Sequence, residues 1–156
     1  MYEKNTLKAL TALDLIVHRA RYVILDPSWG FEGAMDSYSR IYYVKEGRGI
    51  LTVGDTVTEM SGGNMYFIPS ELRFSTSCDY LEKIFFHISI PTAESYDLFF
   101  GASSVATLPF LAEDFDRLKK LIESESYLDM LKVKSVLINS VLKFAEHYEQ
   151  IGRAHV

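Results

Sequence analysis

The side chains best able to do chemistry in this chain are few and widely spaced. The sequence has four histidines and one cysteine, and no histidine occurs between His18 and His87. Cys78 has no histidine near it in sequence, so we do not expect it to act as a nucleophile. Arg40, Lys83 and His87 are the polar candidates, and they can serve one site only if the fold brings them together.

The composition limits the class of protein. A length of 156 residues is typical of one domain, and a net charge of −5 with a pI near 5.4 argues against a nucleic-acid-binding surface. The first residues, MYEKNTLKALTALD, lack the basic head, apolar run and cleavage site of a signal peptide. A single cysteine cannot form an internal disulfide, so a cytoplasmic protein is expected.

The elements that must position these candidates are strands in the first two thirds of the chain. Gly54-Asp55 suits a two-residue type II′ hairpin, whose register pairs Val53 with Thr56. Short strands at regular spacing favour an antiparallel sandwich or barrel. The predicted strands cover residues 13–25, 39–47, 49–53, 56–60, 65–69, 73–77 and 82–90.

After Pro109 the apolar period becomes helical. The first predicted helix has its apolar stripe at Leu111, Phe115, Leu118, Leu121 and Ile122. The second, roughly 127–149, has two stripes, so it is either wedged between the sheet and the first helix or meets a partner subunit with one of them. One stripe holds Leu128, Leu131, Ile138, Leu142 and Ala145, and the other holds Met130, Val133, Leu137, Val141, Phe144 and Tyr148. The predicted dimer interface is drawn from both stripes: Leu131, Val133, Leu137, Ile138, Val141, Leu142 and Ala145.

The strand-rich half resembles a cupin barrel. Gly63 and Pro69 have the spacing of the second cupin motif, and Gly47 fits the end of the first. The resemblance implies a mainly β fold with added α structure: a cupin-like antiparallel β-barrel of the jelly-roll type, followed by two C-terminal helices. It also aligns Arg40 with the metal-binding glutamate and Phe74 with the last metal-binding histidine.

The metal ligands of a cupin are missing from this register. The two remaining histidine positions fall on Ala34 and Asp36, or on Gly33 and Met35 if the gap is one residue longer. Arginine has no lone pair to donate to a cation. The expectation is therefore a barrel without a metal site or cofactor, which excludes metal-dependent dioxygenase and isomerase chemistry.

Strand alternation then predicts the residues that face the barrel interior. If Arg40 points inward, Tyr42 does too. On the last long strand, the mixed face of Lys83, Phe85 and His87 suits a cavity, whereas Ile84, Phe86 and Ile88 suit packing against helices. Trp29 and Glu32 are expected at the barrel mouth. The predicted ligand-binding set is Trp29, Glu32, Arg40, Tyr42, Phe74, Thr76, Lys83, Phe85 and His87.

The ordered wording SRIYYVKEGRGILTV, GGNMYFIPS and LEKIFFHISI, with a helical pair after it, resembles the N-terminal sensor domain of AraC-type transcription regulators. This resemblance covers roughly residues 15–148. It implies an arm (1–14), a barrel (15–108) and, within the same domain, a helical pair for homodimerisation (109–150). It also implies a small-molecule effector, by default a carbohydrate. The chain stops at EQIGRAHV, so the DNA-binding domain of such a regulator is expected to lie outside it.

Two alternatives stay open at this level. Arg40 could form a structural ion pair with Asp36, Glu46 or Glu71 instead of binding a ligand. The chain could also be a metal-free cupin enzyme, such as a sugar epimerase or isomerase, which would need an inward Asp or Glu partner for His87. The sequence favours a sensor that is not an enzyme and has no catalytic residues.

Overall fold

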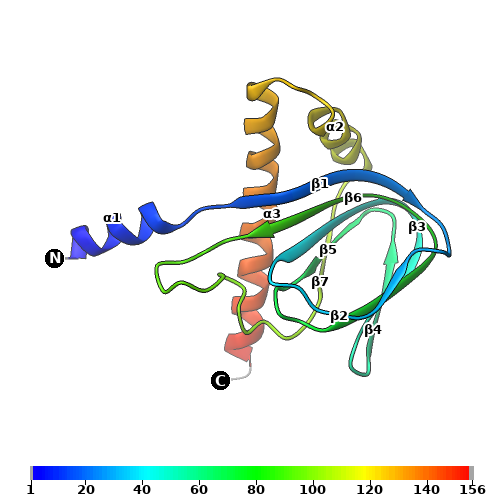
Figure 1. The fold of residues 1–156 in the computed structure, drawn as a ribbon, viewed down its shortest axis with the longest axis horizontal. Coiled ribbons are helices and arrows are strands. Elements are labelled where there is room, and N and C mark those ends of the chain that lie inside the picture. Colours follow the sequence, from blue (N-terminus) through cyan, green and yellow to red (C-terminus); the bar gives the residue numbers. More distant parts are fainter. Residues whose placement is uncertain (1, 155–156) are drawn as a thin grey trace.

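The structure is a computed structural model that describes residues 2–154. It is mainly β, with the two C-terminal helices packed against one side of the sheet, as the sequence predicts (Figure 1). The helices are α1 (Tyr2–Ala12), α2 (Ala112–Ile122) and α3 (Tyr127–Ala154). The strands are β1 (Ile16–Leu25), β2 (Gly30–Ala34), β3 (Ser39–Val53), β4 (Thr56–Ser61), β5 (Asn64–Ile68), β6 (Phe74–Ser89) and β7 (Ala106–Pro109).

The sheet is organised around its two long strands, β3 and β6, which pair antiparallel along most of their length. One edge of β6 pairs with β1 and then with β2, and the far edge of β3 pairs with β5 and then with β4. Both long strands therefore contribute to two halves of the sheet. Figure 1 shows the sheet curling around between these halves.

The curl coincides with irregular pairing near the middle of β3. The register between β3 and β6 shifts between Val44 and Glu46 and again between Arg48 and Gly49. Extra residues of this kind bend a strand and increase its twist. Gly47 lies between the shifts with a φ of 124°, and a Cβ there would lie 2.1 Å from the Tyr80 carbonyl oxygen. Only glycine fits this close approach.

These irregularities explain where the predicted strand boundaries were wrong. The segments 39–47 and 49–53 form one strand, β3, and the segments 73–77 and 82–90 belong to one strand, β6. Cys78, which falls between the two predicted segments 73–77 and 82–90, lies within β6. The predicted hairpin register is confirmed, because Val53 pairs with Thr56 across a turn in which Gly54 has a φ of 57°.

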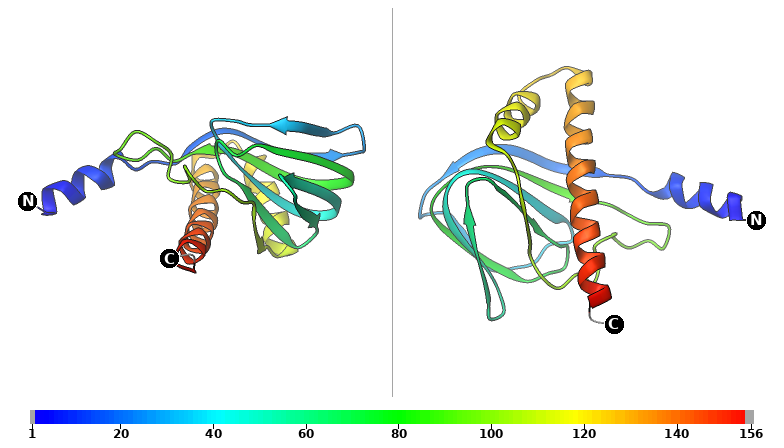
Figure 2. Two further views of the ribbon diagram at one scale, coloured as in Figure 1. Left: turned by 90° about the horizontal axis from the view of Figure 1, so that it is seen from below. Right: turned by 180° about the vertical axis from the view of Figure 1, so that it is seen from behind.

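The two faces of the sheet have separate apolar cores. The inner core fills the space between the two halves and includes Tyr42, Leu51, Met60 and Leu81. The outer core lies between the sheet and the two helices α2 and α3, which Figure 2 shows on one side of the sheet. It joins Ile84, Phe86 and Ile88 of β6 to apolar side chains of the helices: Phe115, Leu118, Leu137, Val141 and Phe144.

One stripe of α3 packs inward and the other is exposed. Leu137 is fully buried, Val141 is buried, and Val133 packs against the same core. Leu137 and Val141 pack mainly into the chain's own outer core, which leaves them little surface for the predicted dimer interface, whereas Val133 is only partly buried. Ala145 also packs against that core. Of the predicted interface, Leu131, Ile138 and Leu142 remain available, with about half or more of each side chain exposed, and Leu128 adjoins them.

The other two helices differ from the sequence prediction, α2 in where it begins and α1 in being a helix at all. In α2, Phe115 and Leu118 are buried, but Leu111 precedes the helix and is exposed. The segment expected as an arm contains a helix, α1, which extends away from the barrel in every view (Figures 1 and 2). None of the helices in residues 2–154 has both the length and the apolar character needed to cross a membrane.

Candidate ligand-binding site

Three neighbouring strands place the predicted inward residues in rows. Across β1, β6 and β3, Arg19 and Arg40 flank His87. In the next row Arg21 and Tyr42 flank Phe85, and beyond it Val23 and Val44 flank Lys83. Residues directly paired across strands share one face of a sheet. Two arginines thus flank a histidine in the first row, an arginine and two aromatic side chains make up the middle row, and a single lysine lies between two valines in the third row.

This face lines a cavity of about 390 Å³. The loop before β2 contributes Trp29 and β2 contributes Phe31, so the cavity is walled by side chains from four strands and their connections. A volume of this size suits a small organic molecule. The lining consists of Arg19, Arg21, Val23, Leu25, Trp29, Phe31, Tyr38, Arg40, Tyr42, Lys83, Phe85 and His87.

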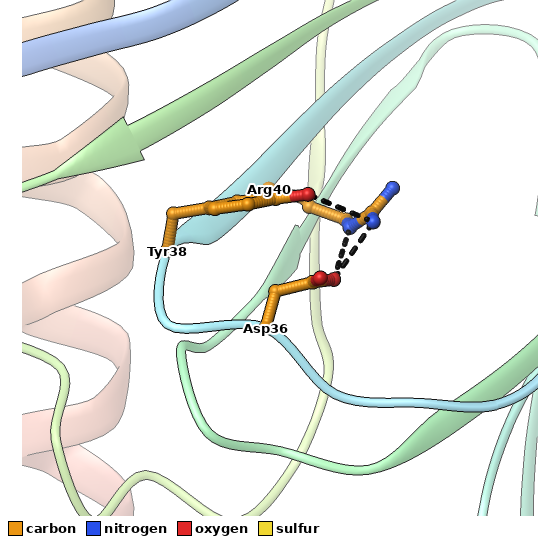
Figure 3. A network of polar contacts seen from close by, with 3 residues as sticks. All are labelled: Asp36, Tyr38 and Arg40. Atoms are coloured by element: carbon orange, nitrogen blue, oxygen red, sulfur yellow. Dashed lines mark hydrogen bonds and ion pairs between the residues drawn. The ribbon is translucent and has the colours of Figure 1, made fainter.

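Arg40 is held in place by polar and aromatic contacts. Its Nη2 donates to Asp36 Oδ2 at 2.7 Å and lies 3.3 Å from the Tyr38 hydroxyl oxygen (Figure 3). The guanidinium carbon lies 5.2 Å and 5.3 Å from the ring centres of Phe31 and Phe74. Arg40 is buried, so these contacts compensate for lost water. The structural ion pair with Asp36, one of the two alternatives for Arg40, is present.

Lys83 is the least expected group in the cavity. Its side chain is 2 % exposed, and no carboxylate of the described residues lies within ion-pair distance of its amine. The Nζ atom lies 3.4 Å from the ring centre of Tyr42 and 4.1 Å from that of Trp29. These are cation–π distances, and the amine has no hydrogen-bond acceptor in the part of the chain that the structure describes.

Burial lowers the pKa of Lys83 well below its usual value, and the charge of Arg40 lowers it further. The aromatic faces of Tyr42 and Trp29 act in the other direction. A desolvated cation–π contact contributes about 2 kcal/mol, whereas an unpaired buried ammonium costs several kcal/mol. The rings therefore offset only part of the cost, and the neutral amine is favoured more than at an ordinary lysine.

Two further polar atoms in the cavity lack a partner. The Tyr42 hydroxyl and His87 Nε2 are both buried without a hydrogen bond among the described residues. Burial, followed by the charges of Arg40 and Arg19, lowers the pKa of His87 to about 4, so its imidazole is neutral near pH 7. The ring stacks on Tyr38, with 4.4 Å between ring centres. Unpaired buried groups of this kind need an explanation, and a bound ligand supplies one.

The predicted site residues divide into those that line the cavity and those that do not. Phe74 packs behind Arg40, and the Thr76 hydroxyl donates to the Ile50 carbonyl at 3.0 Å. Glu32 is exposed and lies outside the lining. The cavity brings together Trp29, Arg40, Tyr42, Lys83, Phe85 and His87.

Sequence reasoning missed Arg19, Arg21 and Tyr38. A signal for the first two exists in IVHRARYVIL, because Arg19, Arg21 and Val23 alternate on one face of a strand. That face could not be assigned without knowing that β1 pairs with the cavity side of β6. Tyr38 precedes β3, where strand alternation gives no guide.

The four positions that correspond to cupin metal ligands do converge. Ala34 pairs with Phe74, and Asp36 bonds to Arg40, which lies over Phe74. Among residues 5–151, whose side chains the structure describes, no three histidine, cysteine or carboxylate side chains are placed to hold a metal ion together. Within the same range, no Asp or Glu is hydrogen-bonded to His87 Nε2, the partner that the enzyme alternative requires.

No protein-family model matches the chain, and no curated protein matches it in sequence. Solved structures do match in fold. ToxT from Vibrio cholerae gives a TM-score of 0.53 at 9% identity over 83% of this chain, and its apo K231A variant gives 0.53 at 8% identity over 88%. The chain corresponds to 56% of the length of ToxT.

A cupin-2 domain protein from Shewanella frigidimarina also matches, with a TM-score of 0.39 at 13% identity over 55% of this chain and 90% of its own. Identities this low transfer no function, and the match to ToxT shows the fold alone. The chain has a cupin-type fold.

Proposed function

We propose that this chain is the effector-sensing and dimerisation part of an AraC-type transcription regulator, and that its cavity binds a small organic anion. The motif order in the sequence supports the family, and ToxT, an AraC-family regulator, shares the fold. In this proposal the domain acts inside the cell without being an enzyme, and DNA is contacted by a different domain of the regulator.

The excess of positive charge in the cavity carries the choice of ligand. Arg40 is paired with Asp36, but among the side chains of residues 5–151 neither Arg19 nor Arg21 has an ion-pair partner at the cavity. A neutral sugar would leave these charges uncompensated, whereas a carboxylate would pair with them. We therefore favour an anion over the carbohydrate that the family resemblance suggests by default.

The aromatic wall supports a flat or apolar body for that anion. Trp29 and Phe31 meet edge to face with 5.7 Å between ring centres, and Trp29 approaches Tyr42 in the same way at 6.5 Å. Phe85 lies in the adjacent row. Aromatic surfaces of this kind bury a ring or short chain and leave its polar end toward the arginines.

Titration calorimetry with benzoate, glucose and benzylamine tests the proposal. We expect benzoate to bind, and Arg40→Ala to weaken its binding by about 10- to 100-fold, the cost of a lost charge-assisted hydrogen bond. Arg48→Ala is the matched control, because Arg48 is exposed and does not line the cavity. Binding of glucose in preference to benzoate would contradict the proposed ligand class.

The exposed stripe of α3 supports homodimerisation. Leu131, Ile138 and Leu142 line a groove of about 540 Å³ together with Leu98 and with Leu13, which follows α1. Exposed apolar side chains that lie together along a groove are typical of an interaction site. A self-complementary helix face would bury this stripe against its copy in a second subunit.

A further inference from the structure

The buried amine of Lys83 is not explained by binding an anion alone. Lysines are almost never fully buried unless they are paired, and no described carboxylate pairs with this one. An apolar side chain would fill the space between Tyr42 and Trp29 without a desolvation cost. Lys83 nevertheless lines the cavity, next to two polar groups that also lack partners.

The surroundings of Lys83 are those that make an amine nucleophilic. A lysine is activated when it is desolvated in an apolar pocket or placed near another cation. Both conditions hold, since Lys83 is enclosed by aromatic rings and Arg40 contributes a second positive charge. A larger neutral fraction leaves the lone pair of the amine available more often for attack on an electrophile.

We propose that Lys83 captures the carbonyl group of an anionic aldehyde or ketone as a reversible imine. This proposal rests on the proposed function, because the arginines at the cavity edge hold the anionic group. It narrows the effector to carbonyl compounds that carry a carboxylate or a similar anion.

The chemistry is balanced without a co-reactant. The lone pair of Nζ forms a bond to the carbonyl carbon, the C=O π electrons move to oxygen, and a proton passes from nitrogen to that oxygen to give a carbinolamine. The hydroxyl group leaves with a proton as water, nitrogen loses its second proton, and a C=N bond forms. The net reaction is amine plus carbonyl giving imine plus water.

Tyr42 and His87 suit the proton transfers in this sequence. Burial raises the pKa of the Tyr42 phenol, so its hydroxyl is protonated and has a proton to donate. His87 is neutral, and its unpartnered Nε2 can accept or return a proton, depending on the tautomer. Both side chains line the same cavity as Lys83.

The test uses 4-carboxybenzaldehyde with sodium cyanoborohydride at pH 7, followed by peptide mapping. Only about one in a thousand ordinary lysine amines is neutral at this pH, so we expect Lys83 to be labelled at least about tenfold faster than the exposed Lys132 and Lys143. Labelling at Lys83 should disappear in Lys83→Met, whose side chain has a similar shape without the amine. Equal labelling of all three lysines would overturn the proposal.

A second probe separates this proposal from the proposed function. The alcohol 4-(hydroxymethyl)benzoate has the carboxylate but no carbonyl, so it should bind reversibly and leave no adduct. If it binds while the aldehyde leaves Lys83 unmodified, the imine is excluded and anion binding stands. If the aldehyde labels Lys83 but neither benzoate nor the alcohol binds, the imine stands and the anion site is wrong. The comparison of Lys83 with the two exposed lysines uses the wild-type protein, so it does not depend on the folding of any variant.

Discussion

Arg40 Nη2 donates a 2.7 Å hydrogen bond to Asp36 Oδ2, four residues earlier in the chain, while its guanidinium lies against the Phe31 and Phe74 rings. The side chain of Asp36 is 27 % exposed and that of Arg40 is 10 % exposed. Asp36 therefore holds the guanidinium at the cavity and also competes with any anion that binds there.

This competition predicts the effect of Asp36→Asn. Removing the carboxylate charge beside Arg40 should tighten benzoate binding by roughly tenfold, because a like charge near the ligand is lost. Glu32→Gln is the control with the same change of charge at an exposed position outside the cavity, and it should have little effect. Titration calorimetry measures both. If Asp36→Asn weakens binding as much as Arg40→Ala does, Asp36 serves only to orient Arg40.

The low pKa of His87 predicts a pH-dependent stability. The unfolded chain binds a proton at this histidine with the ordinary pKa of 6.5, whereas the folded chain does so only near 4. Lowering the pH through this window therefore stabilises the unfolded state, by about 2 kcal/mol between pH 8 and pH 5. Urea unfolding should show that His87→Phe removes this part of the slope. His18→Phe, at an exposed position, should keep it, and equal slopes for all three proteins would refute the assignment.

The two stripes of α3 predict opposite consequences for the same substitution. Leu142→Glu adds a charge to the exposed stripe and should weaken dimerisation at least about tenfold, while lowering the melting temperature only by the stability that the dimer itself contributes. Leu137→Glu buries a charge in the outer core and should destabilise the fold by several kcal/mol. Sedimentation velocity and thermal unfolding separate the two effects, and the exposed Gln150→Glu is the control. A dimer unchanged by Leu142→Glu would exclude this stripe.

The bend in β3 predicts that Gly47 is irreplaceable. Gly47→Ala combines a φ of 124° with a Cβ 2.1 Å from the Tyr80 carbonyl oxygen, and should cost roughly 3 kcal/mol or more in unfolding free energy. Gly54→Ala has a positive φ but open space around its Cβ, so about 1 kcal/mol is expected. Chemical denaturation measures the difference. Equal costs for the two variants would mean that the close approach is relieved by movement of the strand.

The cavity wall was predictable where strand alternation alone decides orientation. Ile84, Phe86 and Ile88 are all apolar and lie in the outer core, which leaves Lys83, Phe85 and His87 for the cavity. The same alternation did not reveal Arg19 and Arg21, because their position depends on pairing with His87 and Phe85, which lie more than 60 residues further along the sequence. Such pairing is a tertiary property that local pattern does not contain.

Where the structure differs from the sequence prediction, the causes are local. Thr76 faces inward as predicted, but its hydroxyl is bonded to the Ile50 carbonyl and is not free for a ligand. Gly47 looked like a strand end because glycine usually marks a turn, whereas here it permits a bend within one continuous strand. Burial of Leu137 and exposure of Leu142 could not be distinguished, since both stripes of the helix are equally apolar in sequence.

Strand β6 tolerates some changes of sequence better than others, because its two faces line different parts of the domain. Substitutions at Lys83, Phe85 or His87 alter the cavity and leave the helix-facing side intact, while those at Ile84 or Phe86 do the reverse. Inserting or deleting one residue in this strand would exchange the two sides, placing Lys83 against the helices and Ile84 in the cavity. Ligand preference can therefore diverge between relatives by point substitution, but the length of this strand cannot change by a single residue.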